Sequence, residues 1–390
     1  MIRDKHVQEL IQELKSLKSS PLFNFSLSSK ELFHSNFLAW LFEQEELKGL
    51  VTEFFRTSLP PEVSHFVFDP VMKDAVQREK QNIDLWLTFH DPNLQGTDRE
   101  SGMWHVWIEN KVKSLPRMEQ LEKYQEKRPE NSTCILLSLS EFEQPMPDWQ
   151  KMTFQEVLAL INQCIAITSD DYTRLILADY VILVKVLLKV DEQAQINQSE
   201  LFDFWSVHSD PLLRTLDDLR LDDFYLKKKY AGLAFEAWNQ LNYQEFEVAP
   251  FRTAIDWQAS SPTVFVNSGM TRATGFLDFK YVIAPDLSIG IQIQGNAYRM
   301  VVEDNTGKRT RALAQNLLEK KMWFDFSPAL DASERYPKRK SFNQFGPVFL
   351  YQSKKIPSNM KWRQVLSICE TNLRYVLQHR HQLLAFLDCE

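Results

Sequence analysis

Two acidic residues and a lysine lie within two short apolar segments in the first third of the chain. Asp84 belongs to segment 82–89, and Glu109 and Lys111 belong to segment 103–112. Both segments have the composition of β-strands, in which successive side chains point to opposite faces. One face of each segment is wholly apolar, and the acid lies on the other. If the two strands pair as a hairpin, Asp84 and Glu109 lie close together, with Lys111 two residues further along.

Two carboxylates on one sheet face repel each other unless a proton or a cation lies between them. A divalent cation such as Mg²⁺ or Mn²⁺ removes this repulsion, since these ions prefer oxygen ligands. Such an ion lowers the pKa of a bound water and neutralises charge on a phosphoryl transition state. Lys111 can orient that water or stabilise the developing negative charge. The backbone carbonyl of Asn110 is a further candidate ligand for the cation.

A predicted helix over residues 116–127 follows the second strand and adds two polar side chains. Gln120 and Tyr124 are four residues apart, so they lie on one face of that helix and can point together at the site. The ordered pattern of an acid, Glu-x-Lys and then QxxxY resembles the PD-(D/E)XK nuclease superfamily, in particular its RecB-like branch of uncharacterised bacterial proteins. The resemblance covers about residues 25–165, with Ile83 in place of the proline that gives the superfamily its name.

The resemblance implies a restriction-endonuclease-like core and a divalent-metal-dependent nuclease, with DNA favoured as the substrate. The catalytic residues that it implies are Asp84, Glu109, Lys111, Gln120 and Tyr124. The metal ligands that it implies are Asp84, Glu109 and Asn110, with Glu79 and Glu31 as accessory acids. A role in bacterial defence or repair, a homo-oligomer and a defence-system partner follow only by analogy with the family.

Each of these residues also has a structural interpretation. Asp84 could be a strand-end acid paired with a lysine, and Glu109 with Lys111 could form a solvated pair. Glu31 stands three residues after Ser28, the spacing of a helix capping box. At the level of function, the alternative is a catalytically inactive nuclease-like binding or interaction protein. A phosphoesterase whose substrate is not nucleic acid is a second alternative.

Over the whole chain, the hydrophobic periodicity predicts a mixed α/β fold with two domains. Helices are expected before residue 60, a buried strand at 133–139, and helices from Thr153 to about 190. The polar segment 190–200 separates a nuclease-like domain, residues 1–190, from a C-terminal mixed α/β domain, residues 200–390. This second domain is a candidate for binding a substrate or partner.

The composition limits the function classes. The chain has 390 residues but only 10 glycines, and it contains neither GxGxxG nor GxxxxGK[ST], which excludes glycine-rich phosphate-binding loops. The four cysteines form no CxxC, so a zinc ribbon is not expected. The N-terminus has no apolar signal segment, and no stretch has the length to span a bilayer, so we expect a cytoplasmic protein.

The charge of the chain is unevenly distributed. The net charge is −7, yet residues 301–390 carry +6. Within this quarter, Lys338, Arg339 and Lys340 follow an aromatic residue, a combination that suits a phosphate backbone with unstacked bases. We expect these three residues to contribute to nucleic-acid binding, with an ordinary solvated loop as the alternative.

Overall fold

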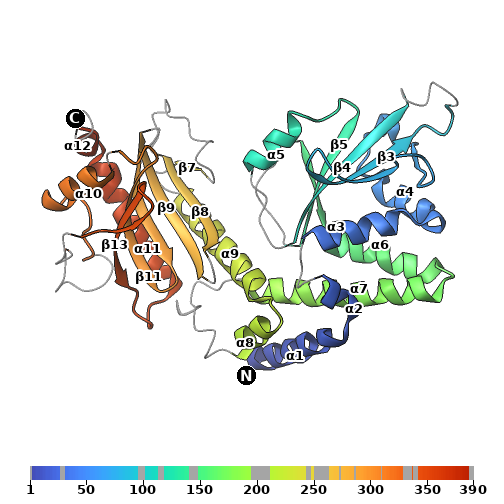
Figure 1. The fold of residues 1–390 in the computed structure, drawn as a ribbon, viewed down its shortest axis with the longest axis horizontal. Helices are drawn as coiled ribbons and strands as arrows, with labels where there is room; N and C mark the ends of the chain where they lie inside the picture. The colour runs from blue at the N-terminus through green and yellow to red at the C-terminus, as the bar shows by residue number, and fades with distance from the viewer. Residues whose placement is uncertain are drawn as a thin grey trace. The chain divides into compact units, whose positions relative to one another are not determined.

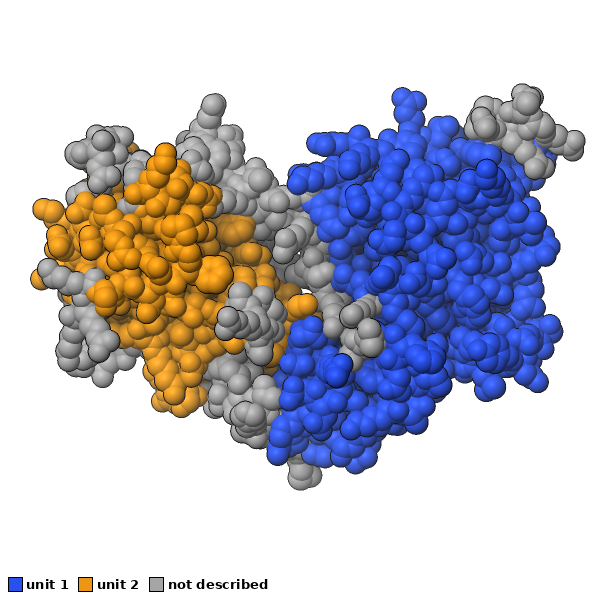
Figure 2. Space-filling model, viewed as in Figure 1, with its two compact units in different colours: residues 1–193, 211–225 blue, residues 194–210, 226–390 orange. Residues whose placement is uncertain are grey.

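The computed structural model forms two compact units, which Figure 2 shows in different colours. The first comprises residues 1–193 and 211–225, and the second comprises residues 194–210 and 226–390. The structure describes residues 2–26, 31–94, 102–112, 118–139, 148–194, 211–242, 247–249, 263–271, 274–284, 287–308, 310–327, 336 and 341–385.

The first unit combines helices with a mixed sheet (Figure 1). Its helices are α1 (Ile2–Ser16), α2 (Pro21–Phe25), α3 (Glu31–Phe42), α4 (Lys48–Arg56), α5 (Met118–Gln125), α6 (Phe154–Ile167), α7 (Asp171–Ala194) and α8 (Pro211–Asp218). Its strands are β1 (Val67–Phe68), β2 (Val76–Lys80), β3 (Ile83–His90), β4 (Met103–Lys111), β5 (Ser132–Ser138) and β6 (Trp149–Thr153). Short 3₁₀ helices lie at Leu17–Ser19, Glu45–Leu47 and Pro61–Val63.

The sheet of the first unit has the order β1-β3-β4-β5-β6, and β2 also pairs with β3. Strands β3 and β4 are antiparallel, whereas β4, β5 and β6 are parallel to one another. A parallel pair needs a crossover connection, and α5 lies in the one between β4 and β5. The site residues of β4 are therefore followed in the chain by a helix that packs back onto the sheet.

Packed side chains cover both faces of this sheet. Leu85, Leu87 and Phe89 of β3 are fully buried on one face, where Phe89 contacts the ring of Phe55 in α4. The opposite face is also covered, because Leu121 of α5 belongs to a buried cluster with aromatic residues of β3, β4 and β6. The further members of that cluster are Ile83, Trp86, Trp107, Tyr124, Cys134, Leu136 and Trp149.

The start of α6 shows how local sequence sets an element boundary. The Thr153 hydroxyl accepts a hydrogen bond from the backbone N–H of Glu156, and the Glu156 carboxylate accepts one from the backbone N–H of Thr153, at 2.6 Å. This is the reciprocal capping box that satisfies donors left open in the first turn of a helix. The helix that the sequence predicts from Thr153 is therefore confirmed, with its first residue at Phe154.

The second unit contains a seven-stranded sheet of order β12-β13-β11-β10-β9-β8-β7. The strands are β7 (Glu247–Ala249), β8 (Thr263–Thr271), β9 (Thr274–Ala284), β10 (Leu287–Gln294), β11 (Ala297–Asp304), β12 (Asn343–Phe345) and β13 (Phe349–Lys355). They are antiparallel except for the pair β7–β8. The helices are α9 (Asp222–Asn242), which begins within the first unit, α10 (Thr310–Glu319), α11 (Trp362–Gln378) and α12 (Arg380–Ala385).

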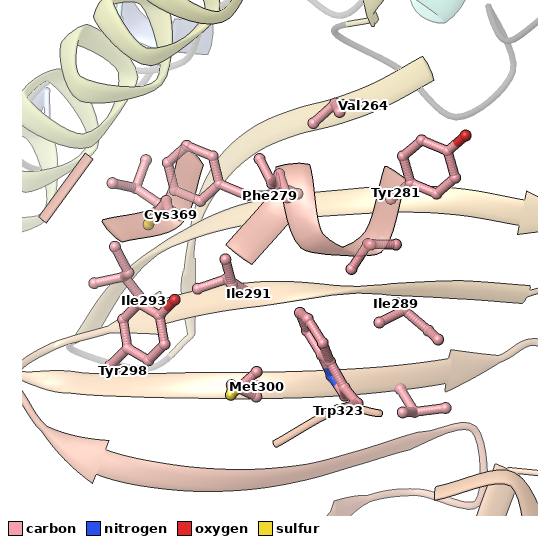
Figure 3. Packing of buried hydrophobic residues seen from close by; sticks show 14 of the residues in the cluster. Val264, Phe279, Tyr281, Ile289, Ile291, Ile293, Tyr298, Met300, Trp323 and Cys369 are labelled. Atoms are coloured by element: carbon pink, nitrogen blue, oxygen red, sulfur yellow. The ribbon is translucent and has the colours of Figure 1, made fainter. Parts of the chain in front are cut away.

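One face of the second sheet carries its hydrophobic core. Ile289, Ile291 and Ile293 alternate along β10 and point to the same side as Met300 and Trp323 (Figure 3). Buried residues of α9, α10 and α11 complete the same cluster. The opposite face is polar and includes Lys280, whose ammonium lies 3.1 Å from Asp278 and 2.9 Å from Glu303.

The predicted fold class is confirmed: the chain is mixed α/β, with a mixed sheet flanked by helices and a second, antiparallel sheet in its C-terminal part. Strands predicted at 82–89, 103–112 and 133–139 correspond to β3, β4 and β5. The extended segment expected at 65–72 contains only the two-residue strand β1. No helix within the described residues combines the length and apolarity needed to cross a membrane.

Candidate active site

Strand pairing brings the predicted carboxylates together. The β3–β4 ladder pairs Leu85 with Ile108, so the next position along it places Asp84 opposite Glu109. The Oδ2 atom of Asp84 accepts a hydrogen bond of 2.7 Å from the backbone N–H of Asn110. This bond holds the acid of one strand against the acid-bearing end of the other.

Lys111 and Glu109 form a buried ion pair. The Lys111 Nζ lies 2.7 Å from Glu109 Oε1, and the two residues are only 7% and 2% exposed. The second carboxylate oxygen, Glu109 Oε2, is buried and has no hydrogen-bond partner among the described residues. A buried oxygen without a donor is costly, so this atom is open to a cation, a proton or an ordered water.

Helix α5 adds both residues of the predicted QxxxY motif. The Gln120 side-chain amide donates to Glu109 Oε1 at 2.9 Å and to the Tyr124 hydroxyl at 2.6 Å. The two side chains meet because residues four apart lie on one helix face. Gln120 therefore links the helix to the carboxylate of β4. Residues 113–117, which connect the strand to the helix, lie outside the described residues.

The carboxylates are held in an environment that disfavours their charge. Burial is the main cause that raises the pKa of Glu109 from 4.5 to about 7 and the pKa of Asp84 from 3.8 to about 6. Lys111 lowers both pKa values. Asp84 and Glu31 add to the raised pKa of Glu109, and Glu79 and Glu31 add to the raised pKa of Asp84. Burial alone would lower the pKa of Lys111, but the surrounding carboxylates, Glu109 first, raise it. The lysine therefore keeps its charge, while the two carboxyl groups take up protons at a higher pH than ordinary carboxyl groups do.

Asn110 connects the site to α3 from the other face of the sheet. Its side-chain amide donates to the backbone carbonyl of Glu31 and to the hydroxyl of Ser35, both at 3.3 Å. The Glu31 carboxylate is near enough to raise the pKa values of Asp84 and Glu109. Ser28, the proposed capping partner of Glu31, lies outside the described residues, and α3 begins at Glu31.

Glu79 reaches the site through an irregular strand. The pairs Arg78–Leu85 and Lys80–Ile83 bracket Glu79 and Asp84, which therefore lie opposite each other. The backbone of Glu79 has a φ of 53°, in the left-handed region that non-glycine residues seldom adopt. Its carboxylate is exposed and contributes to the raised pKa of Asp84. Strained backbone of this kind clusters at functional sites.

The donor set is suitable for a divalent cation, although it is not a complete cage of side chains. Within the described residues, no three His, Cys, Asp or Glu side chains are grouped as a metal site. The fit rests on the unpartnered Oε2 of Glu109 and on the adjacent Asp84 carboxylate, both oxygen ligands of the type that Mg²⁺ and Mn²⁺ prefer. A cation bound through few carboxylates keeps positions for water and substrate, as Mg²⁺ does in phosphate-processing sites.

The structure therefore brings together all the predicted site residues of the first unit: Glu31, Glu79, Asp84, Glu109, Asn110, Lys111, Gln120 and Tyr124. Lys338, Arg339 and Lys340, predicted to bind nucleic acid, lie outside the described residues. Two residues near the site were not predicted from the sequence: Ser35, whose hydroxyl accepts from Asn110, and Lys80, whose Nζ lies 3.8 Å from the centroid of the Trp86 ring. The signal for Lys80 was the pair Gln81–Asn82, since both residues have a positive φ and form a two-residue hairpin turn in which Asn is favoured.

Comparison with known proteins agrees with this geometry. Residues 22–181 match the family model of the PD-(D/E)XK nuclease superfamily. The match runs from α2 into α7 and includes every residue of the site described above. No curated protein and no solved structure was found to be similar to the chain.

Proposed function

We propose that the protein is a divalent-metal-dependent nuclease that hydrolyses phosphodiester bonds of nucleic acid, with DNA favoured as the substrate. The observation that carries this proposal is the buried Glu109–Lys111 pair beside Asp84, in which the second Glu109 oxygen has no donor among the described residues. Such a cluster costs stability unless a cation completes it. Hydrolysis of phosphodiesters is the chemistry of the superfamily whose family model residues 22–181 match.

Each residue of the site has its own role in the proposed reaction. When bound, Mg²⁺ or Mn²⁺ supplies charge neutralisation at the phosphoryl group and acidifies a water. Asp84, Glu109 and the carbonyl of Asn110 would hold the ion, with Glu79 or Glu31 as accessory acids. Lys111 positions the attacking water or stabilises the negative charge that develops on the phosphate oxygens.

Gln120 and Tyr124 act through the residues beside them. The Gln120 amide orients Glu109, and the Tyr124 hydroxyl in turn restrains the Gln120 amide, at the distances given above. This pairing supports an assignment to the RecB-like branch. The proposal also includes a role in bacterial defence or repair. It further includes a contribution to substrate binding from the second unit and from Lys338, Arg339 and Lys340.

The experiment incubates the purified full chain with linear, nicked and circular DNA and with RNA, in Mg²⁺, in Mn²⁺ and in chelator. The comparison includes Asp84→Ala and Lys111→Ala, with circular dichroism to verify that both variants fold. We expect metal-dependent cleavage by the wild type and a loss of roughly 100-fold or more in each variant.

Cleavage that survives both substitutions would refute the site. Metal-dependent hydrolysis of small phosphodiesters, without cleavage of DNA or RNA, would instead indicate a phosphoesterase of another class. Binding of nucleic acid without cleavage under any metal would indicate the catalytically inactive alternative.

A further inference from the structure

A lysine beside the candidate active site has an aromatic contact instead of a carboxylate partner. Lys80 is the last residue of β2, and its Nζ lies 3.8 Å from the centroid of the Trp86 ring. The side chain is partly exposed, and no ion pair joins it to a carboxylate of the described residues. A cation over an indole is stabilised without being neutralised. The ammonium charge therefore remains available to an anion.

The same indole positions a histidine. The Trp86 Nε1–H donates a hydrogen bond of 2.9 Å to Nδ1 of His105 on β4. An indole N–H can only donate, so Nδ1 must be the acceptor, and in the neutral ring the proton lies on Nε2. Burial, and then the charge of Lys80, lower the pKa of His105, which favours that neutral ring. No hydrogen bond of the described residues uses Nε2, so the N–H of His105 has no acceptor among them. His105 and the Lys80 ammonium both contact the Trp86 ring system.

These groups lie on the sheet face of the carboxylates, displaced along the strands. Trp86 follows Asp84 by two residues on β3, so the two side chains share a face about 7 Å apart. His105 lies opposite Thr88, one further step along the same face. A step of this size is comparable to the spacing of successive phosphates along a nucleic-acid strand. A strand with one phosphate at Asp84 and Glu109 can thus place a neighbouring phosphate near Lys80.

Trp86 itself does not offer a stacking surface for a base. The residue is only 4% exposed, because the ring of Trp107 lies beside it, with 4.8 Å between the ring centroids, and Lys80 covers the ring. Its role is to hold two donors in place, a cation on its ring and a histidine on its N–H. Two donors of this kind recognise phosphate oxygens, which accept hydrogen bonds and carry charge, and they carry no information about base sequence.

We propose that Lys80 and His105 form a subsite for a phosphate that neighbours the scissile phosphate on the bound strand. The subsite rests on the proposed function, because its ligand is the nucleic-acid substrate of the same site. It accounts for a lysine beside the carboxylates that lies over the Trp86 ring, whereas Lys111 is the lysine that lowers the pKa values of Asp84 and Glu109.

The test measures binding of a fluorescein-labelled single-stranded DNA 20-mer to the full chain at pH 8 in chelator, where the proposed reaction cannot proceed. The dissociation constant is determined from 50 to 300 mM salt for the wild type and four variants. Lys80→Met keeps the apolar stem on Trp86 and removes the charge, Lys80→Arg restores it, and His105→Ala removes the second donor. Lys48→Met is the matched control, because Lys48 is an exposed lysine on α4 of the same unit.

The expected results differ between the variants. Lys80→Met weakens binding roughly 3- to 10-fold and lowers the slope of log affinity against log salt by about 0.7, the loss of one phosphate contact. Lys80→Arg restores both quantities. His105→Ala weakens binding roughly 2- to 10-fold and leaves the slope unchanged, since the neutral ring releases no counterion. Lys48→Met changes neither quantity.

A Lys80→Met variant with the affinity and slope of the wild type would overturn the subsite while leaving wild-type cleavage, and the proposed function, intact. A wild type that binds no nucleic acid would overturn both. A wild type that binds with the expected variant pattern but cleaves nothing would support the phosphate subsite and refute the nuclease.

Discussion

Replacing Glu109 with its neutral isostere should stabilise the metal-free protein at pH 8, although the residue is central to the proposed chemistry. Burial raises the pKa of Glu109 from 4.5 to about 7. At pH 8 the side chain is ionised in the folded and in the unfolded state, so this difference in pKa corresponds to about 3 kcal/mol of lost stability. Glu109→Gln removes the charge and keeps an oxygen that can accept from Lys111 and Gln120.

The sign of the effect depends on pH. A carboxyl group with a raised folded-state pKa binds more protons when folded, so the metal-free protein loses stability as the pH rises from about 4.5 to about 7. At pH 4.5 the folded wild type is already protonated at Glu109, and the variant should gain less than about 0.5 kcal/mol. At pH 8 the gain should be about 1–3 kcal/mol, or roughly 2–10 °C in the unfolding temperature of the first unit.

The assay is thermal and urea unfolding of wild type and Glu109→Gln at pH 4.5 and pH 8, in chelator and in Mn²⁺. Glu62→Gln, at an exposed site of the same unit, is the control and should change stability by less than about 0.5 kcal/mol. Mn²⁺ should raise the unfolding temperature of the wild type and leave that of Glu109→Gln unchanged. A variant that is destabilised at pH 8, or equally affected at both pH values, would refute the raised pKa of Glu109.

Three further predictions concern single side chains. Tyr124→Phe removes the 2.6 Å contact to Gln120 and should reduce kcat roughly tenfold with little change in KM in steady-state cleavage assays. An unchanged kcat would exclude Tyr124 from the site. Thr153→Ala breaks the capping box of α6 and should cost about 1 kcal/mol in urea unfolding without loss of cleavage activity; an unchanged stability would contradict the cap. Trp323→Ala empties a fully buried position in the core of the second unit and should lower the free energy of unfolding by about 3–5 kcal/mol. A decrease below about 1 kcal/mol would contradict that packing.

The sequence was sufficient for the arrangement of the principal site residues because strand and helix periodicities leave little freedom. Alternation along 103–112 places Glu109 and Lys111 on one face, and they form an ion pair in β4. The spacing of Gln120 and Tyr124 predicts a shared helix face, and their side chains meet in α5. Both inferences depend only on local geometry. The catalytic roles of these residues stay predictions.

Contacts that depend on tertiary structure or irregular backbone were beyond the sequence. The polar strand β2 lacks apolar alternation, and the left-handed backbone at Glu79 interrupts its regular pairing, so neither the strand nor the position of Lys80 was predicted. Strand β6 has two exposed residues in succession, which also hides its period. The amide of Asn110 binds α3 across the sheet, a contact 79 residues apart in the chain. Only the packed fold specifies such a contact.

The central claim is that Asp84 and Glu109 hold one divalent cation. Binding of this cation does not need Lys111, whereas cleavage of the substrate does. Isothermal titration of Mn²⁺ at pH 8, paired with DNA cleavage on the same samples, tests this directly. We predict one site per wild-type chain, no site in Asp84→Asn or Glu109→Gln, and a retained site in a Lys111→Ala variant that no longer cleaves. Equal Mn²⁺ binding by all four proteins, or cleavage by Lys111→Ala at the wild-type rate, would contradict the account.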